Sequence, residues 1–284
     1  MTTLNLDRLV PAYVREFEPY IPSKPDHELK KLYGCERLYR LNNNENPLGP
    51  PPAAQEVIRR FPPPRGAVYP SGDSYDLRQE IARLHGIDPD QVIVGNGANE
   101  VIAFVVKAFC QPGDNIVTAD KTFAVYEWVA TFSGIEARLV PLKDERFDDR
   151  GMLARIDDRT KALFVCNPNN PTGTYWTKDT LREFLDAIDG RQMVILDEAY
   201  FEFVEAGDYP NGIPLIREHP NLIVFRTFSK MYGIAGLRIG YLVADPSAAD
   251  MIRRTCIVYS VNAIAQEAAL ACLRDDTGHI ARTR

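Results

Sequence analysis

Residues 193–200 read MVILDEAY and residues 222–230 read LIVFRTFSK, two short apolar runs that each end in polar side chains. Continuous apolar runs of this length are typical of strands buried on both faces of a parallel sheet. Outward from this pair, similar runs such as VIVG (92–95) and KALFVC (161–166) alternate with helical patterns such as LREFLDAIDG (181–190). This alternation predicts an α/β fold in which a mainly parallel sheet lies between helices.

The composition is that of an ordinary soluble globular protein. The chain has 284 residues, of which 45% are hydrophobic and 25% charged, so one large or two modest domains fit. Its 33 Lys and Arg against 39 Asp and Glu give a formal net charge of -6. Because a phosphate backbone is held mainly by clustered cations, we expect no nucleic-acid partner and a small-molecule activity instead.

Cysteine usage and the N-terminal sequence point to a reduced, cytoplasmic compartment. The five cysteines are scattered and odd in number. Asp7 and Arg8 lie where a secretory peptide would have its apolar core, and the longest apolar run, VIAFVV (101–106), is too short to span a bilayer. That short run predicts no membrane association. The four histidines are isolated from one another and from cysteine pairs, so we expect no metal centre.

Two predicted strands are followed by loops that could bind a ligand, since ligands collect at the carboxyl ends of parallel strands. GNGANE (95–100) joins a strand to a helix, and the free amides at such a helix N-terminus can bind phosphate. Taken alone, this sequence is more often a plain turn. NPNNPTG (167–173) predicts a rigid loop in which the amide side chains need partners if they are buried. A purely structural turn is the alternative.

Asp197 and Lys230 end two further strands. A carboxylate such as Asp197 is costly to bury unless it meets a cation or a protonated ligand, although a helix-capping aspartate is about equally common. Lys230 alone would be a solvated surface charge, but with Thr227, Ser229 and Arg238 nearby it could act as an amine nucleophile. A phosphate site, a buried acid and such an amine together match the requirements of pyridoxal phosphate.

Six segments in this chain resemble, in order, those of the class I/II, fold-type I pyridoxal-phosphate-dependent aminotransferases, and most of all the histidinol-phosphate aminotransferase family. The segments are NNNENPLGP (42–50), YPSGDSYDLR (69–78), GNGANE (95–100), NPNNPTG (167–173), DEAY (197–200) and TFSKMYGIAGLRIGY (227–241). The resemblance implies an aspartate-aminotransferase-like large domain with a seven-stranded sheet. It also implies transamination of L-histidinol phosphate with 2-oxoglutarate in histidine biosynthesis.

The same resemblance implies roles for individual residues. Lys230 would form the Schiff base with pyridoxal 5'-phosphate and Asp197 would pair with its ring nitrogen, while Asn170 and Tyr200 would bond the ring hydroxyl. Phe123 would stack on the ring. The cofactor phosphate would be held by Ala98, Asn99, Thr227, Ser229 and Arg238, and by Tyr69 from the neighbouring subunit of a homodimer. The substrate would contact Tyr20 and Asn46.

We expect three regions along the chain. Residues 1–45 form an N-terminal arm that contributes to the small domain, residues 46–245 form the large cofactor-binding domain, and residues 246–284 begin a C-terminal small domain that is incomplete compared with relatives. The helical segment 262–273 is therefore expected to leave an apolar face exposed.

The cofactor motifs do not choose the substrate. An aromatic amino-acid aminotransferase or a phosphothreonine decarboxylase on the same scaffold therefore stays open as an alternative. A catalytically weak protein that binds pyridoxal phosphate is a further one.

Overall fold

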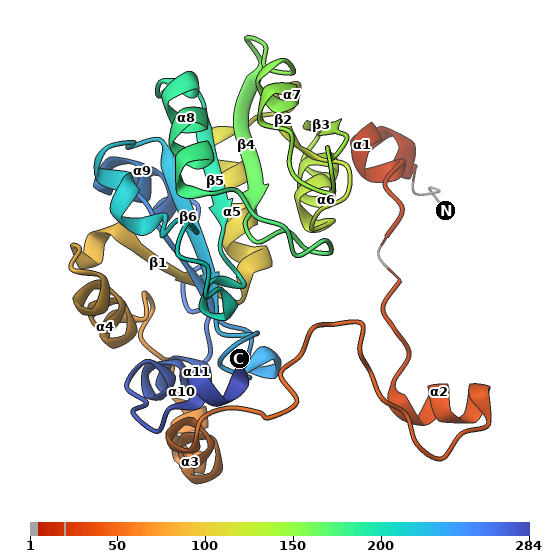
Figure 1. The fold of residues 1–284 in the computed structure, drawn as a ribbon. Coiled ribbons are helices and arrows are strands. Elements are labelled where there is room, and N and C mark those ends of the chain that lie inside the picture. Colours follow the sequence, from red (N-terminus) through yellow and green to blue (C-terminus); the bar gives the residue numbers. More distant parts are fainter. Residues whose placement is uncertain (1–4, 20) are drawn as a thin grey trace.

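A computed structural model describes residues 5–19 and 21–284 of the chain. Its centre is a seven-stranded sheet in the order β1-β7-β6-β5-β4-β2-β3, drawn in Figure 1. The strands are β1 (Val92–Gly95), β2 (Asn115–Ala119), β3 (Glu136–Val140), β4 (Thr160–Cys166), β5 (Met193–Asp197), β6 (Leu222–Thr227) and β7 (Gly240–Val243). The predicted α/β fold with a seven-stranded, mainly parallel sheet is confirmed.

One strand runs against the others. β7 pairs antiparallel with both β1 and β6, whereas the pairs among β2, β3, β4, β5 and β6 are parallel. β6 and β7 are joined by a segment with one short 3-10 helix and no crossover α-helix, so the chain returns in the opposite direction. The carboxyl end of β1 therefore lies at the same edge of the sheet as those of β4, β5 and β6.

Helices cover both faces of the sheet, as its continuously apolar strands require. On one face α5 (Ala98–Phe109) packs against α6 (Val125–Phe132) and α9 (Pro246–Arg253). On the other, α7 (Asp149–Leu153) packs against α8 (Lys178–Ile188), and Figure 1 shows α8 in front of the sheet with α5 behind it. The N-terminus of α8 is capped by the Thr177 hydroxyl, which accepts a hydrogen bond from the Thr180 amide.

A second group of helices lies beside the sheet. α10 (Ala263–Leu273) packs against α3 (Pro52–Arg60) and α4 (Tyr75–His85), and α11 (His279–Thr283) follows it. Four side chains of α10 are buried in these contacts: Ala265, Ala268, Ala269 and Cys272. The expectation that this helix leaves an apolar face exposed is therefore wrong, because α3 and α4 cover it.

The N-terminal part of the chain extends away from this body. It holds α1 (Ala12–Arg15), which packs against α6, and α2 (Asp26–Tyr33), which stands apart from the sheet in Figure 1. Large apolar side chains on this part are exposed, among them Ile21, Leu32 and Leu41. The remaining elements are 3-10 helices at Leu6–Arg8, Pro63–Ala67, Pro89–Gln91, Phe201–Phe203, Ile213–Arg217 and Ala235–Leu237.

Candidate active site

The loops at the carboxyl edge of the sheet enclose a cavity of about 330 Å³. Segments far apart in the sequence line it, because β1, β4, β5 and β6 all end at this edge and the segment before β7 begins there. The predicted site residues on its wall are Ala98, Asn99, Phe123, Asn170, Asp197, Tyr200, Thr227, Ser229, Lys230 and Arg238. Two other predicted residues, Asn46 and Tyr69, do not line it, and Tyr20 lies outside the described residues.

Asp197 forms the buried end of the cavity. Its side chain is 3% exposed, and each carboxylate oxygen has one donor. The Tyr126 hydroxyl donates to Oδ2 at 2.6 Å and the Ala199 amide donates to Oδ1 at 3.0 Å. Burial raises the pKa of Asp197, while these two hydrogen bonds and the positive charge of Lys230 act in the opposite direction. A protonated, positively charged ligand group beside this carboxylate would compensate for its burial.

Lys230 is half-buried on the wall of the same cavity. Its Nζ donates to the Asn43 carbonyl at 2.7 Å and lies 5.8 Å from the centroid of the Tyr200 ring. Burial lowers the pKa of Lys230, the charge of Arg238 lowers it further, and Glu45 and Asp197 oppose that change. The amine is therefore neutral, and nucleophilic, at a lower pH than an ordinary lysine.

Another group of residues on the cavity wall is suited to bind an anion. Ala98 and Asn99 are the first two residues of α5, so their amides are free at the positive end of the helix. The guanidinium of Arg238 lies directly against Gly97, the residue before this helix, and a Cβ at position 97 would clash with it. The hydroxyl-bearing residues Thr227 and Ser229 complete the wall.

Asn170 and Tyr200 also line the cavity. Tyr200 accepts a hydrogen bond at its hydroxyl from Nδ2 of Asn44 at 2.9 Å. Burial raises the pKa of Tyr200, so the phenol stays protonated and can donate to a ligand oxygen. The loop that carries Asn170 is fixed in part by Asn169, whose side chain donates to the Lys121 carbonyl at 3.0 Å.

Two predicted site residues, Asn46 and Tyr69, lie elsewhere. The Asn46 side chain donates to the Met231 carbonyl at 2.8 Å, so it ties the N-terminal segment to the residue after Lys230 and does not line the cavity. Tyr69 is 79% exposed and its ring lies 4.8 Å from that of Tyr259. Tyr20 lies outside the described residues.

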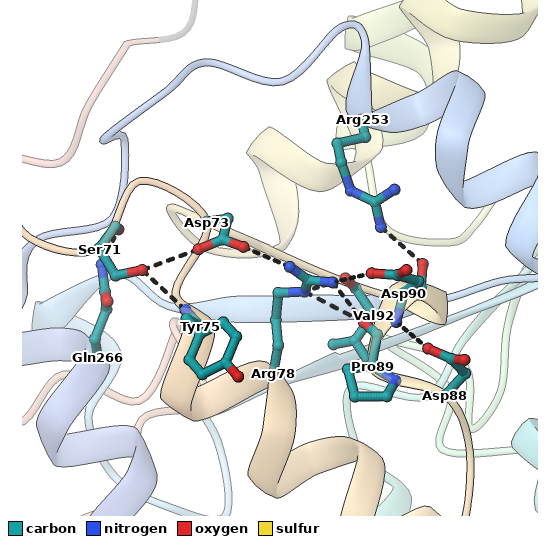
Figure 2. A network of polar contacts seen from close by, with 10 residues as sticks. All are labelled: Ser71, Asp73, Tyr75, Arg78, Asp88, Pro89, Asp90, Val92, Arg253 and Gln266. Atoms are coloured by element: carbon teal, nitrogen blue, oxygen red, sulfur yellow. Dashed lines mark hydrogen bonds and ion pairs between the residues drawn. The ribbon is translucent and has the colours of Figure 1, made fainter.

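The turn that follows Tyr69 is held rigidly. Figure 2 shows the buried Arg78 at the centre of a network in which it bonds the Asp73 carboxylate at 2.5 Å and the Asp90 carboxylate at 2.8 Å. The Ser71 hydroxyl donates to Asp73 and accepts from the Tyr75 amide. Tyr69 is thus displayed on the surface beside a well-anchored turn, a position from which it can reach another molecule.

Sequence reasoning missed several residues of this site. Tyr126 lies one helical turn after Phe123, yet nothing in the sequence shows that its hydroxyl turns to Asp197. Asn43 and Glu45 line the cavity from the same motif as Asn46, and that motif was the available signal. The pairing of Arg226 with Glu198, through hydrogen bonds of 2.8 and 3.0 Å in the core, was also missed.

Comparison with known proteins agrees with this geometry. Residues 36–283 match the family described as aminotransferase class I and II, and the chain belongs to this family. It is 42% identical over 266 residues to the histidinol-phosphate aminotransferase of Geobacillus thermodenitrificans, an alignment that covers 94% of this chain and 73% of that protein.

Among solved structures, the chain is similar to both an aminotransferase and a decarboxylase. The chain is similar to histidinol-phosphate aminotransferase from Sinorhizobium meliloti in complex with pyridoxal-5'-phosphate, with a TM-score of 0.87 and 27% identity over 96% of this chain and 73% of that one. It is also similar to L-threonine-O-3-phosphate decarboxylase from Porphyromonas gingivalis, with a TM-score of 0.69 and 26% identity over 79% and 68% of the two chains.

Proposed function

We propose that this cavity binds pyridoxal 5'-phosphate. The observation that carries the proposal is that one cavity is lined by a buried carboxylate, by a group of anion-binding residues and by the Lys230 amine. Asp197 suits the protonated ring nitrogen, because a cation compensates its burial. Gly97 leaves room for the Arg238 guanidinium beside the N-terminus of α5, where it suits the phosphate. A side chain at residue 97 would displace the guanidinium.

The other residues on the wall have matching roles. The amides of Ala98 and Asn99 and the hydroxyls of Thr227 and Ser229 would bind the phosphate oxygens. Phe123 would cover one face of the ring. Asn170 and Tyr200 would hydrogen-bond the ring hydroxyl, with Asn44 holding the Tyr200 phenol in place.

The chemistry we propose is amino-group transfer. When bound, pyridoxal phosphate supplies an electron sink that lets a proton leave the Cα of an amino substrate. Asp197 would maintain the charge of the ring nitrogen through its ionised carboxylate. Lys230 would take the Cα proton and deliver it within the site, a role for which its lowered pKa is suited. The Asn43 carbonyl, 2.7 Å from Nζ, would orient the amine between these positions.

We further propose that the amino donor is L-histidinol phosphate and the acceptor 2-oxoglutarate, in histidine biosynthesis. The relatives named above support this choice, and the cavity itself accommodates the shared cofactor of all such enzymes without selecting a substrate. We assign residues 1–45 to an N-terminal arm, 46–245 to the cofactor-binding domain and 246–284 to the start of a small domain. We place the protein in the cytoplasm as a homodimer. In the described part of the chain no helix is long and apolar enough to cross a membrane.

The test is a comparison of amino donors on one purified preparation. Formation of glutamate from 2-oxoglutarate would be measured with L-histidinol phosphate, with phenylalanine and with O-phosphothreonine, and release of carbon dioxide would be followed for the last. We expect the highest kcat/KM with histidinol phosphate and no turnover in Lys230→Ala. Preferred turnover of phenylalanine, or decarboxylation of O-phosphothreonine, would replace the proposed substrate with one of the alternatives.

A further inference from the structure

Tyr126 links two sides of the cavity without lining it. Its side chain is fully buried in α6, and its hydroxyl donates to Oδ2 of Asp197 at 2.6 Å. The other carboxylate oxygen accepts from the Ala199 amide. With one donor on each oxygen, the plane of the carboxylate is fixed from two directions, and neither donor belongs to a ligand.

The Tyr126 ring is itself held on two sides. It stacks on Phe164, with ring centroids 5.0 Å apart and an interplanar angle of 27°. It meets Phe123 edge to face, at 5.6 Å and 83°. Because Phe123 lines the cavity, the position of Tyr126 determines both the aromatic wall and the direction of the Asp197 carboxylate.

We propose that Tyr126 is a positioning residue, which keeps the Asp197 carboxylate ionised and turned toward the cavity through its hydrogen bond. The inference rests on the proposed binding of pyridoxal phosphate, because it concerns the partner of the ring nitrogen. Tyr126 does not line the cavity, so its hydroxyl acts through Asp197 and its ring acts through Phe123.

The charges around Asp197 set the direction of the expected effect. Burial raises the pKa of Asp197, and the hydrogen bond from Tyr126 is the first of the influences that lower it. Without this bond the pKa of Asp197 would rise further. Burial also raises the pKa of Tyr126, so its phenol remains a donor throughout the range in which Asp197 titrates. The titratable groups that face Asp197 from its own strand end, from β4, from α6 and from the loop after β6 are Glu198, Tyr200, Cys166, Tyr126 and Lys230.

The experiment measures cofactor affinity as a function of pH, by absorbance titration of the apoprotein with pyridoxal phosphate. Protonation of Asp197 removes the partner of the ring nitrogen, so affinity falls on the acid side. We expect Tyr126→Phe to bind about tenfold more weakly near neutral pH, the loss typical of one hydrogen bond to a charged group. We also expect the acid limb of its profile, the pH range in which cofactor affinity falls, to lie about one unit higher than in the wild type.

The matched control is Tyr241→Phe. Tyr241 is also buried, but it lies within β7 and its hydroxyl is 3.4 Å from His85 rather than bonded to Asp197. This variant should retain the wild-type affinity and acid limb. A similar change in both variants would assign the effect to general loosening of the fold and would overturn the proposal.

A double-mutant cycle separates positioning from packing. In an Asp197→Asn background there is no carboxylate to keep ionised, so Tyr126→Phe should have little further effect on affinity. Full additivity of the two substitutions would overturn the proposal. A fluorotyrosine at position 126, whose hydroxyl is a stronger donor, should move the acid limb to lower pH, and it decides the question if Tyr126→Phe does not fold.

The wild-type titration keeps the two proposals apart. If the wild-type apoprotein takes up no pyridoxal phosphate, the proposed function fails. If it binds the cofactor and Tyr126→Phe matches it in both affinity and acid limb, only the role of Tyr126 is overturned.

Discussion

The guanidinium of Arg238 packs against the backbone of Gly97, although 141 positions of sequence separate the two residues. Gly97 adopts a φ of +84°, and a Cβ there would occupy the place of the guanidinium. The pair therefore joins the start of α5 to the segment before β7, and Arg238 lines the cavity beside Ala98 and Asn99.

We expect Gly97→Ala to weaken cofactor binding about ten- to a hundredfold, because a displaced Arg238 loses charge-assisted hydrogen bonds to the phosphate. Gly113→Ala is the control, since Gly113 also has a positive φ, +96°, but has open space around it. Both variants should lose about 1 kcal/mol of unfolding free energy from backbone strain, measured by urea titration. Equal cofactor affinity in the two variants would contradict the assignment of Arg238.

Lys230 should be the lysine that captures the cofactor. Its lowered pKa leaves more neutral amine at a given pH than an ordinary lysine has, so near neutral pH the label should go to Lys230 first. Borohydride reduction of the loaded protein followed by peptide mapping would locate the pyridoxyl group. Recovery of the label on Lys121 or Lys161 would end this assignment.

His85 should make stability depend on pH. Burial, and secondarily the charge of Arg226, lowers the pKa of His85 to about 4, below the value near 6.5 of an unfolded chain. The unfolded state then binds more protons, so this contribution is present above about pH 6.5 and is lost as pH falls toward 4. We expect the wild-type protein to lose on the order of 2 kcal/mol of unfolding free energy through this group as pH falls from about 6.5 to about 4. The loss is smaller than for a fully buried ring because the His85 ring is partly exposed. His85→Gln should not show this loss. Urea unfolding of both proteins at several pH values would show it; parallel curves would refute it.

We expect a homodimer whose sites use residues of both chains. Light scattering should give twice the 32.0 kDa chain mass. Tyr69 is exposed on an anchored turn and Lys230 lies in the cavity, so a Tyr69→Phe chain and a Lys230→Ala chain would each damage a different half of a shared site. Mixed dimers should regain activity that neither parent has, whereas independent chains would regain none beyond the parents' average.

Much of the fold could be predicted from the sequence because its signals are local. The runs at 193–197 and 222–227 are continuously apolar, and both are buried strands. The direction of β7 could not be predicted, because GYLV has the same composition whichever way it pairs. The covering of α10 by α3 and α4 was equally hidden, since it depends on contacts between distant segments.

The placement of residues in the cavity followed from one rule, that polar residues directly after parallel strands meet at one edge. That rule placed Asp197 and Lys230 on its wall. It could not place Tyr126, which reaches Asp197 from the first turn of α6, and it could not show that the Asn46 side chain bonds a backbone carbonyl. Such partners depend on side-chain directions that only the packed structure defines.

The position of β7 between β1 and β6 has a consequence for the order in which the protein assembles during synthesis. β1 is joined to the rest of the sheet only through β7, whose Gly240 lies opposite both Gly95 and Thr227. A ribosome must therefore release almost all of the described chain before the first strand made can enter the sheet, while β2 to β6 can pair earlier. The anion-binding part of the cavity needs residues 97–99 as well as 227–238, so we expect a nascent chain to bind the cofactor only after β7 has been made.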